Sequence, residues 1–145
     1  RLGYLSYNER IGKYRLGSAV LTLGYSMLAG LTVREIARPM LQEIADYSGV
    51  SAALGDRDRL NVLYVECCRA DTAVTLRLDV GSRIPIATSA IVNAVGVPVR
   101  RPSGGLMAIN CGGPSFIVHR ERIEKDIGPR LVRIAQQIEA SLVRR

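Results

Sequence analysis

The chain has 145 residues, of which 48% are hydrophobic and 23% are charged. These values are ordinary for one globular domain, and they exclude a disordered, collagenous or acidic-tail protein. A chain of this length buries roughly two-thirds of the surface that it exposes when unfolded, so it can form a core without disulfides. Its apolar runs are broken by charge or glycine before the roughly 20 residues that a membrane helix needs, so we expect no membrane partner.

Basic residues outnumber acidic residues by 20 to 13, which gives a net charge of +7. Residues 119–145 mix both signs, a pattern typical of a solvated helix face. The N-terminal stretch differs because it holds one glutamate and four basic residues, Arg1, Arg10, Lys13 and Arg15. We therefore expect a local basic patch there that can contact phosphate.

The three cysteines, Cys67, Cys68 and Cys111, cannot all pair, and none stands in a CxxC or Cys/His ligand spacing. We interpret them as reduced thiols of a cytoplasmic protein, one of the vicinal pair buried and the other at the surface, with no metal and no cofactor. His119 is the one histidine, and we interpret it as a helix-start residue rather than a general base.

The first expected elements are a β-hairpin and a helix. Residues 4–7 and 13–16 read as short strands around a turn at 8–12. A hairpin of this size is marginal alone, so we expect it to pack on something outside these residues. Apolar residues at helical spacing then predict a helix over 17–30.

A second helix is predicted from Thr32, which forms a capping-box pattern with Glu35. An apolar stripe runs from Val33 to Ala45, and residues 48–49 read as the stop. Pro39 inside this stripe predicts a kink or a missing hydrogen bond.

The pattern then changes to strands, over 50–54, 60–67 and 73–78, with a charged turn at 56–59 between the first two. Residues 85–90 read as a helix start. Two further strands are expected at 91–99 and 106–111, with a turn region at 98–105 between them and a stop at 112–114. A long amphipathic helix ends the chain, with a bend or break at 128–129. Strands segregated from helices predict an α+β fold with a five-stranded, mostly antiparallel sheet.

The chain has none of the GxGxxG, P-loop, GxSxG or HExxH motifs, so we expect no catalytic residues. The segment 85–90 is a candidate binding element, because backbone N–H groups at a helix start would attract a carboxylate. Asn110 and Gly112 would line the same cavity, the glycine by letting a ligand approach the backbone. The residues alone favour the other interpretation, that these are ordinary cap and strand-end residues, because such residues are common at these positions.

Five motifs in order resemble the IclR family of bacterial transcription regulators. The run Tyr4-Leu5, then Lys13 to Gly17, then Leu23-Gly24 is similar to the family's wing and linker helix. Further matches are residues 81–90, 93–99 and 108–114, which resemble the family's "G…lPlhatA", "naiaaPv" and "aisvsGP" elements.

This resemblance implies a GAF-like effector-binding domain at 31–145, preceded by a remnant β-wing at 1–16 and a linker helix at 17–30. It implies a homodimer or tetramer that binds promoter DNA and a small carboxylate effector. The family's ligand contacts fall on seven residues of this chain, Leu76, Leu78, Ala90, Ile91, Ala94, Asn110 and Gly112. The wing residues Arg10, Lys13 and Arg15 would contact DNA phosphates.

The chain also departs from the family pattern. Residues 90 and 91 adjoin where the family has a further helix, strand and acidic residue, so the resemblance implies a missing segment between them. Most of a winged helix would also precede residue 1. Ala94 stands where the family often has a cysteine or polar group, and Gly112 and Asn110 each replace a serine. The pocket would therefore be more apolar on two sides, so we expect an aromatic or longer-chain acid rather than glyoxylate.

The function predicted is therefore a ligand-responsive DNA-binding transcriptional regulator and not an enzyme. Two alternatives stay open. GAF-like folds also host thiol-dependent enzymes, for which the three cysteines would be the candidates. The domain would otherwise be a plain dimerisation module with a dry core.

Overall fold

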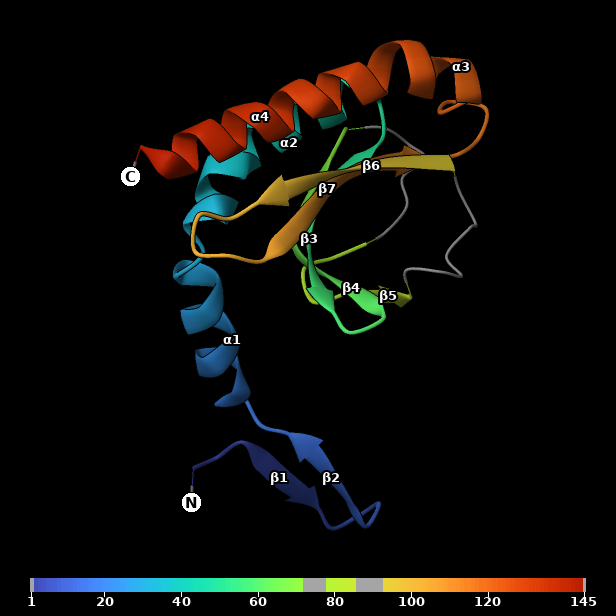
Figure 1. Cartoon of the computed structure of the whole chain (residues 1–145). Coiled ribbons are helices and arrows are strands. Elements are labelled where there is room, and N and C mark those ends of the chain that lie inside the picture. Colours follow the sequence, from blue (N-terminus) through green and yellow to red (C-terminus); the bar gives the residue numbers. More distant parts are fainter. Residues whose placement is uncertain (1, 72–77, 86–92, 145) are drawn as a thin grey trace. The chain divides into compact units, whose positions relative to one another are not determined.

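The computed structural model describes residues 2–71, 78–85 and 93–144. The chain divides into two compact units, Arg1–Thr32 and Val33–Arg145. Helices and strands are segregated along most of the chain, and the described strand pairs are all antiparallel (Figure 1). The predicted α+β class is therefore confirmed.

The first unit contains strands β1 (Leu5–Asn8) and β2 (Lys13–Leu16) and helix α1 (Val20–Ala29). The strands form the predicted hairpin, with the Tyr7 and Tyr14 rings 5.0 Å apart. The Gly17 N–H closes the hairpin on the Tyr4 carbonyl at 2.8 Å, where a Cβ atom would lie 2.2 Å from a backbone oxygen. No described residue of this unit is buried, as expected for a hairpin that needs a partner surface.

The second unit begins one residue into helix α2 (Thr32–Ser48), which runs through Pro39 without a break. Its stripe of Val33, Ala37, Leu41 and the following turns is buried, so tertiary packing outweighs the hydrogen bond that proline removes. The helix ends where Gly49 takes φ +73°, as its sequence predicts.

The C-terminal helix is continuous but irregular, over α3 (Arg120–Arg122), the π-helical segment η1 (Ile123–Ile127) and α4 (Gly128–Val143). The predicted disturbance at Gly128-Pro129 takes the form of this π segment rather than a break. A Cβ at Gly128 would lie 2.6 Å from the Ile123 carbonyl oxygen, to which the Gly128 N–H donates. The wider turn thus ends at a residue that needs no side chain.

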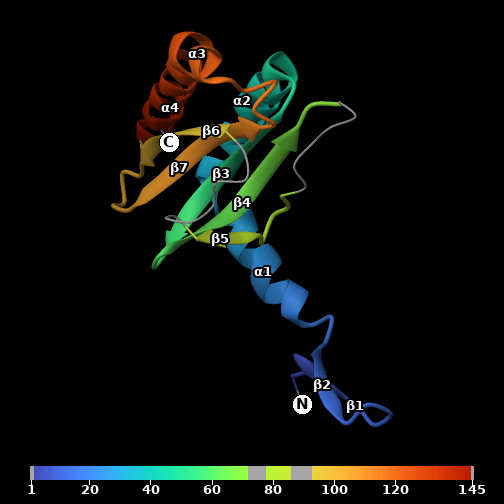
Figure 2. The same cartoon turned by 90° about the vertical axis from the view of Figure 1, so that its right-hand side faces the viewer.

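The sheet has five described strands in the order β5-β4-β3-β7-β6 (Figure 2). Their bounds are β3 Ser51–Asp58, β4 Asn61–Arg69, β5 Arg83–Pro85, β6 Asn93–Arg100 and β7 Leu106–Gly113. α4 packs on β6 and β7, and α2 contacts β4. Both helices cover the same face of the sheet (Figures 1 and 2).

Several predicted boundaries were wrong. The turn predicted at 56–59 is strand as far as Asp58, because Asp56 to Asp58 pair with β4 and leave only Arg59 and Leu60 as the loop. A two-residue hairpin loop requires a residue with positive φ, and Arg59 adopts φ +58°. The turn expected from Pro98 begins at Arg101, and the strand expected to stop at Gly112 includes both glycines.

Two other predictions concern the edge of the sheet. The strand predicted at 73–78 falls mostly outside the described residues, but Leu78 itself is not in a strand. The edge of β4 is paired instead with β5, which ends at Pro85, the residue expected to open a helix. The rest of that helix start, 86–90, lies outside the described residues, as do the junction 90–91 and the start of the strand expected at 91–99.

Candidate functional site

The two faces of the sheet carry different side chains. Toward the helices point large apolar residues such as Leu54, Val99 and Ile109, all fully buried. The opposite face, here called the open face, carries small or polar residues of four strands. They are Ser51, Ala53 and Gly55 of β3, Tyr64 and Cys67 of β4, Ala94 and Gly96 of β6, and Ala108, Asn110 and Gly112 of β7. Among the described residues of the second unit, no helix covers this face (Figure 2).

Three of the seven predicted effector residues come together on the open face. Ala94 lies directly opposite Gly112 across the β6–β7 pair, and Asn110 lies opposite Gly96. A Cβ atom at Gly112 would approach the Cβ of Ala94 to 2.8 Å, closer than side chains tolerate. The glycine is therefore needed for this strand contact, in addition to any access that it gives a ligand.

Asn110 has a partner that sequence reasoning missed. Its Nδ2 donates a 2.7 Å hydrogen bond to the hydroxyl of Tyr64. Burial raises the pKa of Tyr64 above its ordinary value of 10.0, although the Asn110 hydrogen bond lowers it in part. The hydroxyl therefore stays protonated near neutral pH and keeps a proton to donate.

A β-bulge explains why alternation along the sequence does not reveal Tyr64. Strict alternation would put Tyr64 and Glu66 on one face of the sheet. The register instead shifts at Leu54/Gly55, so that Gly55 opposes Tyr64 while Leu54 opposes Glu66. Tyr64 lies on the open face with Asn110, whereas Glu66 points to the helices and pairs with α2.

The remaining predicted effector residues are not brought into this group. Leu78 is half-buried, and its carbonyl accepts a 2.6 Å hydrogen bond from Arg69 Nη2, which also pairs with Asp79. Leu76, Ala90 and Ile91 lie outside the described residues.

The three predicted DNA-contacting residues lie in the hairpin of the first unit. Lys13 and Arg15 are two residues apart in β2, so both lie on the same face of this strand. Arg15 Nε donates to the Ser6 hydroxyl at 3.1 Å. Arg10 is in the turn, where its backbone N–H donates to Asn8. All three side chains are exposed, so they are available to a phosphate backbone.

The cysteines do not have the environment of reactive thiols. Burial raises the pKa of Cys67 to about 11 and also raises those of Cys68 and Cys111. As predicted, one of the vicinal pair, Cys68, is buried, while Cys67 is partly exposed. Cys111 Sγ lies 3.4 Å from the hydroxyl of Ser48, the last residue of α2. Thiols whose pKa is raised in this way are poor nucleophiles at neutral pH, because little of the thiolate is present.

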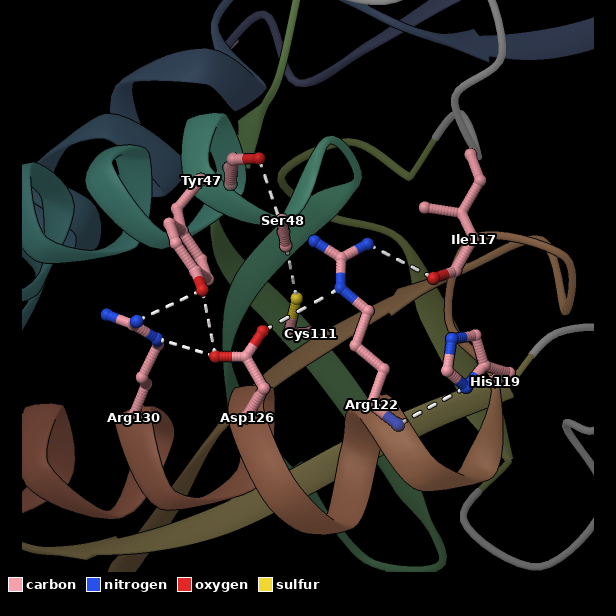
Figure 3. Close-up of polar contacts among 9 residues, drawn as sticks. Tyr47, Ser48, Cys111, Ile117, His119, Arg122, Asp126 and Arg130 are labelled. Carbon is pink, nitrogen blue, oxygen red and sulfur yellow. Dashed lines mark hydrogen bonds and ion pairs between the residues drawn. The ribbon is translucent and has the colours of Figure 1, made fainter.

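The helix-covered side carries a separate polar network (Figure 3). Asp126 accepts from Tyr47 and from Arg130, whose guanidinium carbon lies 3.9 Å from the centre of the Tyr47 ring. A shallow cleft of about 230 Å³ between α2 and α4 borders this network. His119 caps α3, with Nδ1 accepting from the Arg122 N–H at 3.3 Å, which confirms its predicted role as a helix-start residue.

Within the described ranges 2–71, 78–85 and 93–144, no helix is long and apolar enough to span a bilayer. The same residues contain no group of three or more histidines, cysteines or acids placed to hold a metal ion.

The structure is an α+β domain with helices on one side of an antiparallel sheet and the open face of small and polar residues on the other. The family described as "Bacterial transcriptional regulator IclR C-terminal" matches residues 25–93. The regulator TsaQ1/TsaQ2 of Comamonas testosteroni is 31% identical over 130 residues, which are 86% of this chain and 47% of that protein. The chain belongs to the IclR family of transcriptional regulators.

Solved structures give the same result. An IclR-family regulator from Brucella abortus is 29% identical, with a TM-score of 0.87 over 98% of this chain and 75% of its own. An IclR homolog from Microbacterium hydrocarbonoxydans, solved in complex with 4-hydroxybenzoate, shares the fold with a TM-score of 0.74 at 18% identity, over 99% of this chain and 81% of its own. This chain spans about half the length of TsaQ1/TsaQ2. The curated relatives are named as transcriptional regulators and not as enzymes.

Proposed function

We propose that this chain is the effector-binding domain, linker helix and wing of a ligand-responsive regulator that binds promoter DNA in the cytoplasm as a dimer or tetramer. The proposed boundaries are 1–16 for the wing, 17–30 for the linker helix and 31–145 for the effector domain, and the division of the chain after Thr32 supports the last of these. The observation that carries the proposal is the Asn110–Tyr64 pair on an open face of small residues.

The chemistry of this pair favours an acidic ligand. Because Tyr64 already accepts from Asn110, its own proton is left to donate to a carboxylate oxygen. The neighbouring Ala94, Gly96 and Gly112 offer a flat surface of small residues, on which an aromatic ring fits better than a small hydrophilic acid. The complex of the Microbacterium homolog with 4-hydroxybenzoate supports an aromatic acid as the ligand class for this fold.

The regulator would respond by a shift in population. An effector moves an equilibrium only by the difference in its affinity for the two states, so the acid must bind one arrangement of the dimer more tightly. A two-fold dimer matches a pseudo-palindromic operator. Arg10, Lys13 and Arg15 would contact phosphates, which positions the wing on DNA rather than reading its sequence.

The effector prediction is tested by thermal unfolding of the full-length protein with 4-hydroxybenzoate, benzoate, glyoxylate and phenol. An acid present at 100 times its Kd adds about 2.7 kcal/mol of stability. We expect the two aromatic acids to raise the Tm more than glyoxylate, and phenol to have little effect. Asn110→Leu should remove the shift, whereas Asn8→Leu in the wing should keep it. The site is wrong if no acid raises the Tm or if Asn110→Leu responds like the wild type.

The DNA prediction is tested by the salt dependence of binding to a duplex selected from a random library. Each alanine substitution at Arg10, Lys13 or Arg15 should lower the salt slope by about 1 and weaken binding to all sequences alike. Arg120→Ala, an exposed residue of α3, is the matched control and should leave the slope unchanged. A changed sequence preference with an unchanged slope would contradict phosphate contact.

The two alternatives have less support. A thiol-dependent enzyme needs a lowered cysteine pKa, but burial raises the pKa of Cys67, Cys68 and Cys111. A plain dimerisation module predicts that none of the four compounds binds, so the thermal experiment also decides that case.

A further inference from the structure

Glu66 is a buried acid that the proposed effector site does not use. It lies on β4, facing the helices, and is 1% exposed. A buried carboxylate is costly unless charges compensate it, and replacing a buried ion pair with apolar residues is often neutral or stabilising. Stability alone therefore does not account for an acid at this position.

Two arginines of α2 hold Glu66 and the residue before it. Arg34 Nε lies 2.9 Å from Glu66 Oε2, and Arg38 Nη1 lies 2.9 Å from Oε1. Arg34 Nε also donates to the carbonyl of Val65 at 3.1 Å. The backbone N–H of Cys67 also donates to Oε1 at 3.2 Å.

These contacts hold the β-bulge itself. Val65 is the residue of β4 left without an opposing residue where the register shifts. It separates Tyr64, which meets Asn110 on the open face, from Glu66, which meets α2 on the other. Bulges turn side chains to new directions and recur beside functional sites. Three consecutive residues thus connect the proposed effector face to a helix across the sheet.

The helix reached in this way is directly connected to the linker. Only two residues separate the end of α1 from the start of α2, and Arg34 and Arg38 lie in the first two turns of α2. Gln42, one turn further along, donates to the Arg69 carbonyl at 2.9 Å, so α2 contacts β4 at four-residue spacing. The contacts nearest the linker are the ones made to the bulge.

We propose that Arg34, Arg38 and Glu66 form a positioning clamp that transmits effector binding from the open face of β4 to the start of α2. The inference rests on the proposed function, because it assigns a route to the response of that site. A ligand that moves Tyr64 displaces the bulge, and the clamp carries this displacement into α2 instead of letting the strand shift alone. Removing the clamp should separate ligand binding from the DNA response.

The test uses the full-length protein, the selected DNA duplex and 4-hydroxybenzoate. Allosteric responses typically change affinity by 5- to 150-fold, so we expect about a tenfold change in DNA Kd for the wild type. Glu66→Gln should bind the acid and the free DNA within about threefold of wild type but respond less than about twofold. Hydrogen exchange of residues 33–38 should change on adding the acid in the wild type and not in the variant.

Arg38→Met and Gln42→Ala complete the design. The Arg38 side chain is more than half exposed, so Arg38→Met should keep the fold even if Glu66→Gln does not. Arg38→Met should also reduce the response of DNA binding to the acid. Gln42→Ala breaks an α2–β4 contact outside the bulge and should respond normally. A full response in Glu66→Gln or Arg38→Met, or an equal loss in Gln42→Ala, overturns the clamp while the effector site stands. A wild type that neither binds the acid nor changes its DNA affinity overturns both proposals.

Discussion

One strand of the sheet presents two different environments to its two sides. Met107, Ile109 and Cys111 of β7 face the helices and are at most 1% exposed. Asn110 and Gly112, between and beside them, face the other way and are partly exposed. The comparison teaches that stability and recognition are separated here by the two-residue period of the strand. Adjacent residues should therefore respond to mutation in opposite ways.

The largest expected contrast is between Ile109→Ala and Asn110→Ala. Ile109 is fully buried, so truncation removes apolar contacts and leaves a cavity that costs about 2–5 kcal/mol. Asn110→Ala removes one hydrogen bond to Tyr64, which costs about 0.5–1.5 kcal/mol. Urea unfolding of the two variants measures the difference.

The ligand response should show the reverse order. Ile109→Ala should bind 4-hydroxybenzoate at temperatures where it is folded, whereas Asn110→Ala should lose the binding. Equal stability losses in the two variants would mean that the open face is part of the core, and the separation of roles would then be wrong.

A second contrast lies within the open face, between two glycines on paired strands. Gly112→Ser places a Cβ 2.8 Å from that of Ala94, so β6 and β7 must shift, at a cost of about 1–3 kcal/mol. Gly96→Ala meets nothing closer than 3.8 Å and gains strand propensity, so its stability should be unchanged or raised by about 0.5 kcal/mol. Thermal unfolding of both variants measures the order, and a serine tolerated at 112 would show that the strand contact is not tight.

The sequence predicted the fold better than the site, for physical reasons. The stripe of α2, its glycine stop and the terminal helix follow from local periodicity, which tertiary packing reinforces here. Asn110 and Gly112 share one face of β7, as their two-residue spacing predicts, because β7 alternates without interruption. The loop of the β3–β4 hairpin was misplaced because charged residues 56–58 read as a turn, although strand pairing accommodates them at the sheet end.

Tyr64 and Glu66 were missed for a different reason. Both depend on the bulge at Val65, which reverses the alternation between them. No turn residue or glycine in β4 marks this position, since the register shift is set by the pairing with β3. Pairwise partners across 28 or 46 residues of sequence, such as Arg38–Glu66 and Tyr64–Asn110, are properties of the folded chain.

The smallest expected effect concerns pH and the thiol of Cys67 on the open face. Burial raises its pKa from 9.0 to about 11, with Arg69 opposing the shift. The folded protein therefore favours the neutral thiol. The resulting stability is fully present below pH 9, the unfolded value, and is lost as the pH rises from 9 through 11.

Comparing the wild type with Cys67→Ala isolates this contribution, because Tyr64, Cys68 and Cys111 shift in the same direction and are common to both proteins. In urea unfolding at pH 8, 9.5 and 11, the variant should lose less stability than the wild type as the pH rises, with the larger difference between pH 9.5 and 11. Iodoacetamide should accordingly label Cys67 slowly at pH 8, and bound 4-hydroxybenzoate should slow the labelling further, because the thiol shares its sheet face with Asn110. Fast labelling at pH 8 that the acid does not affect would contradict both the burial of the Cys67 thiol and its position on the effector face.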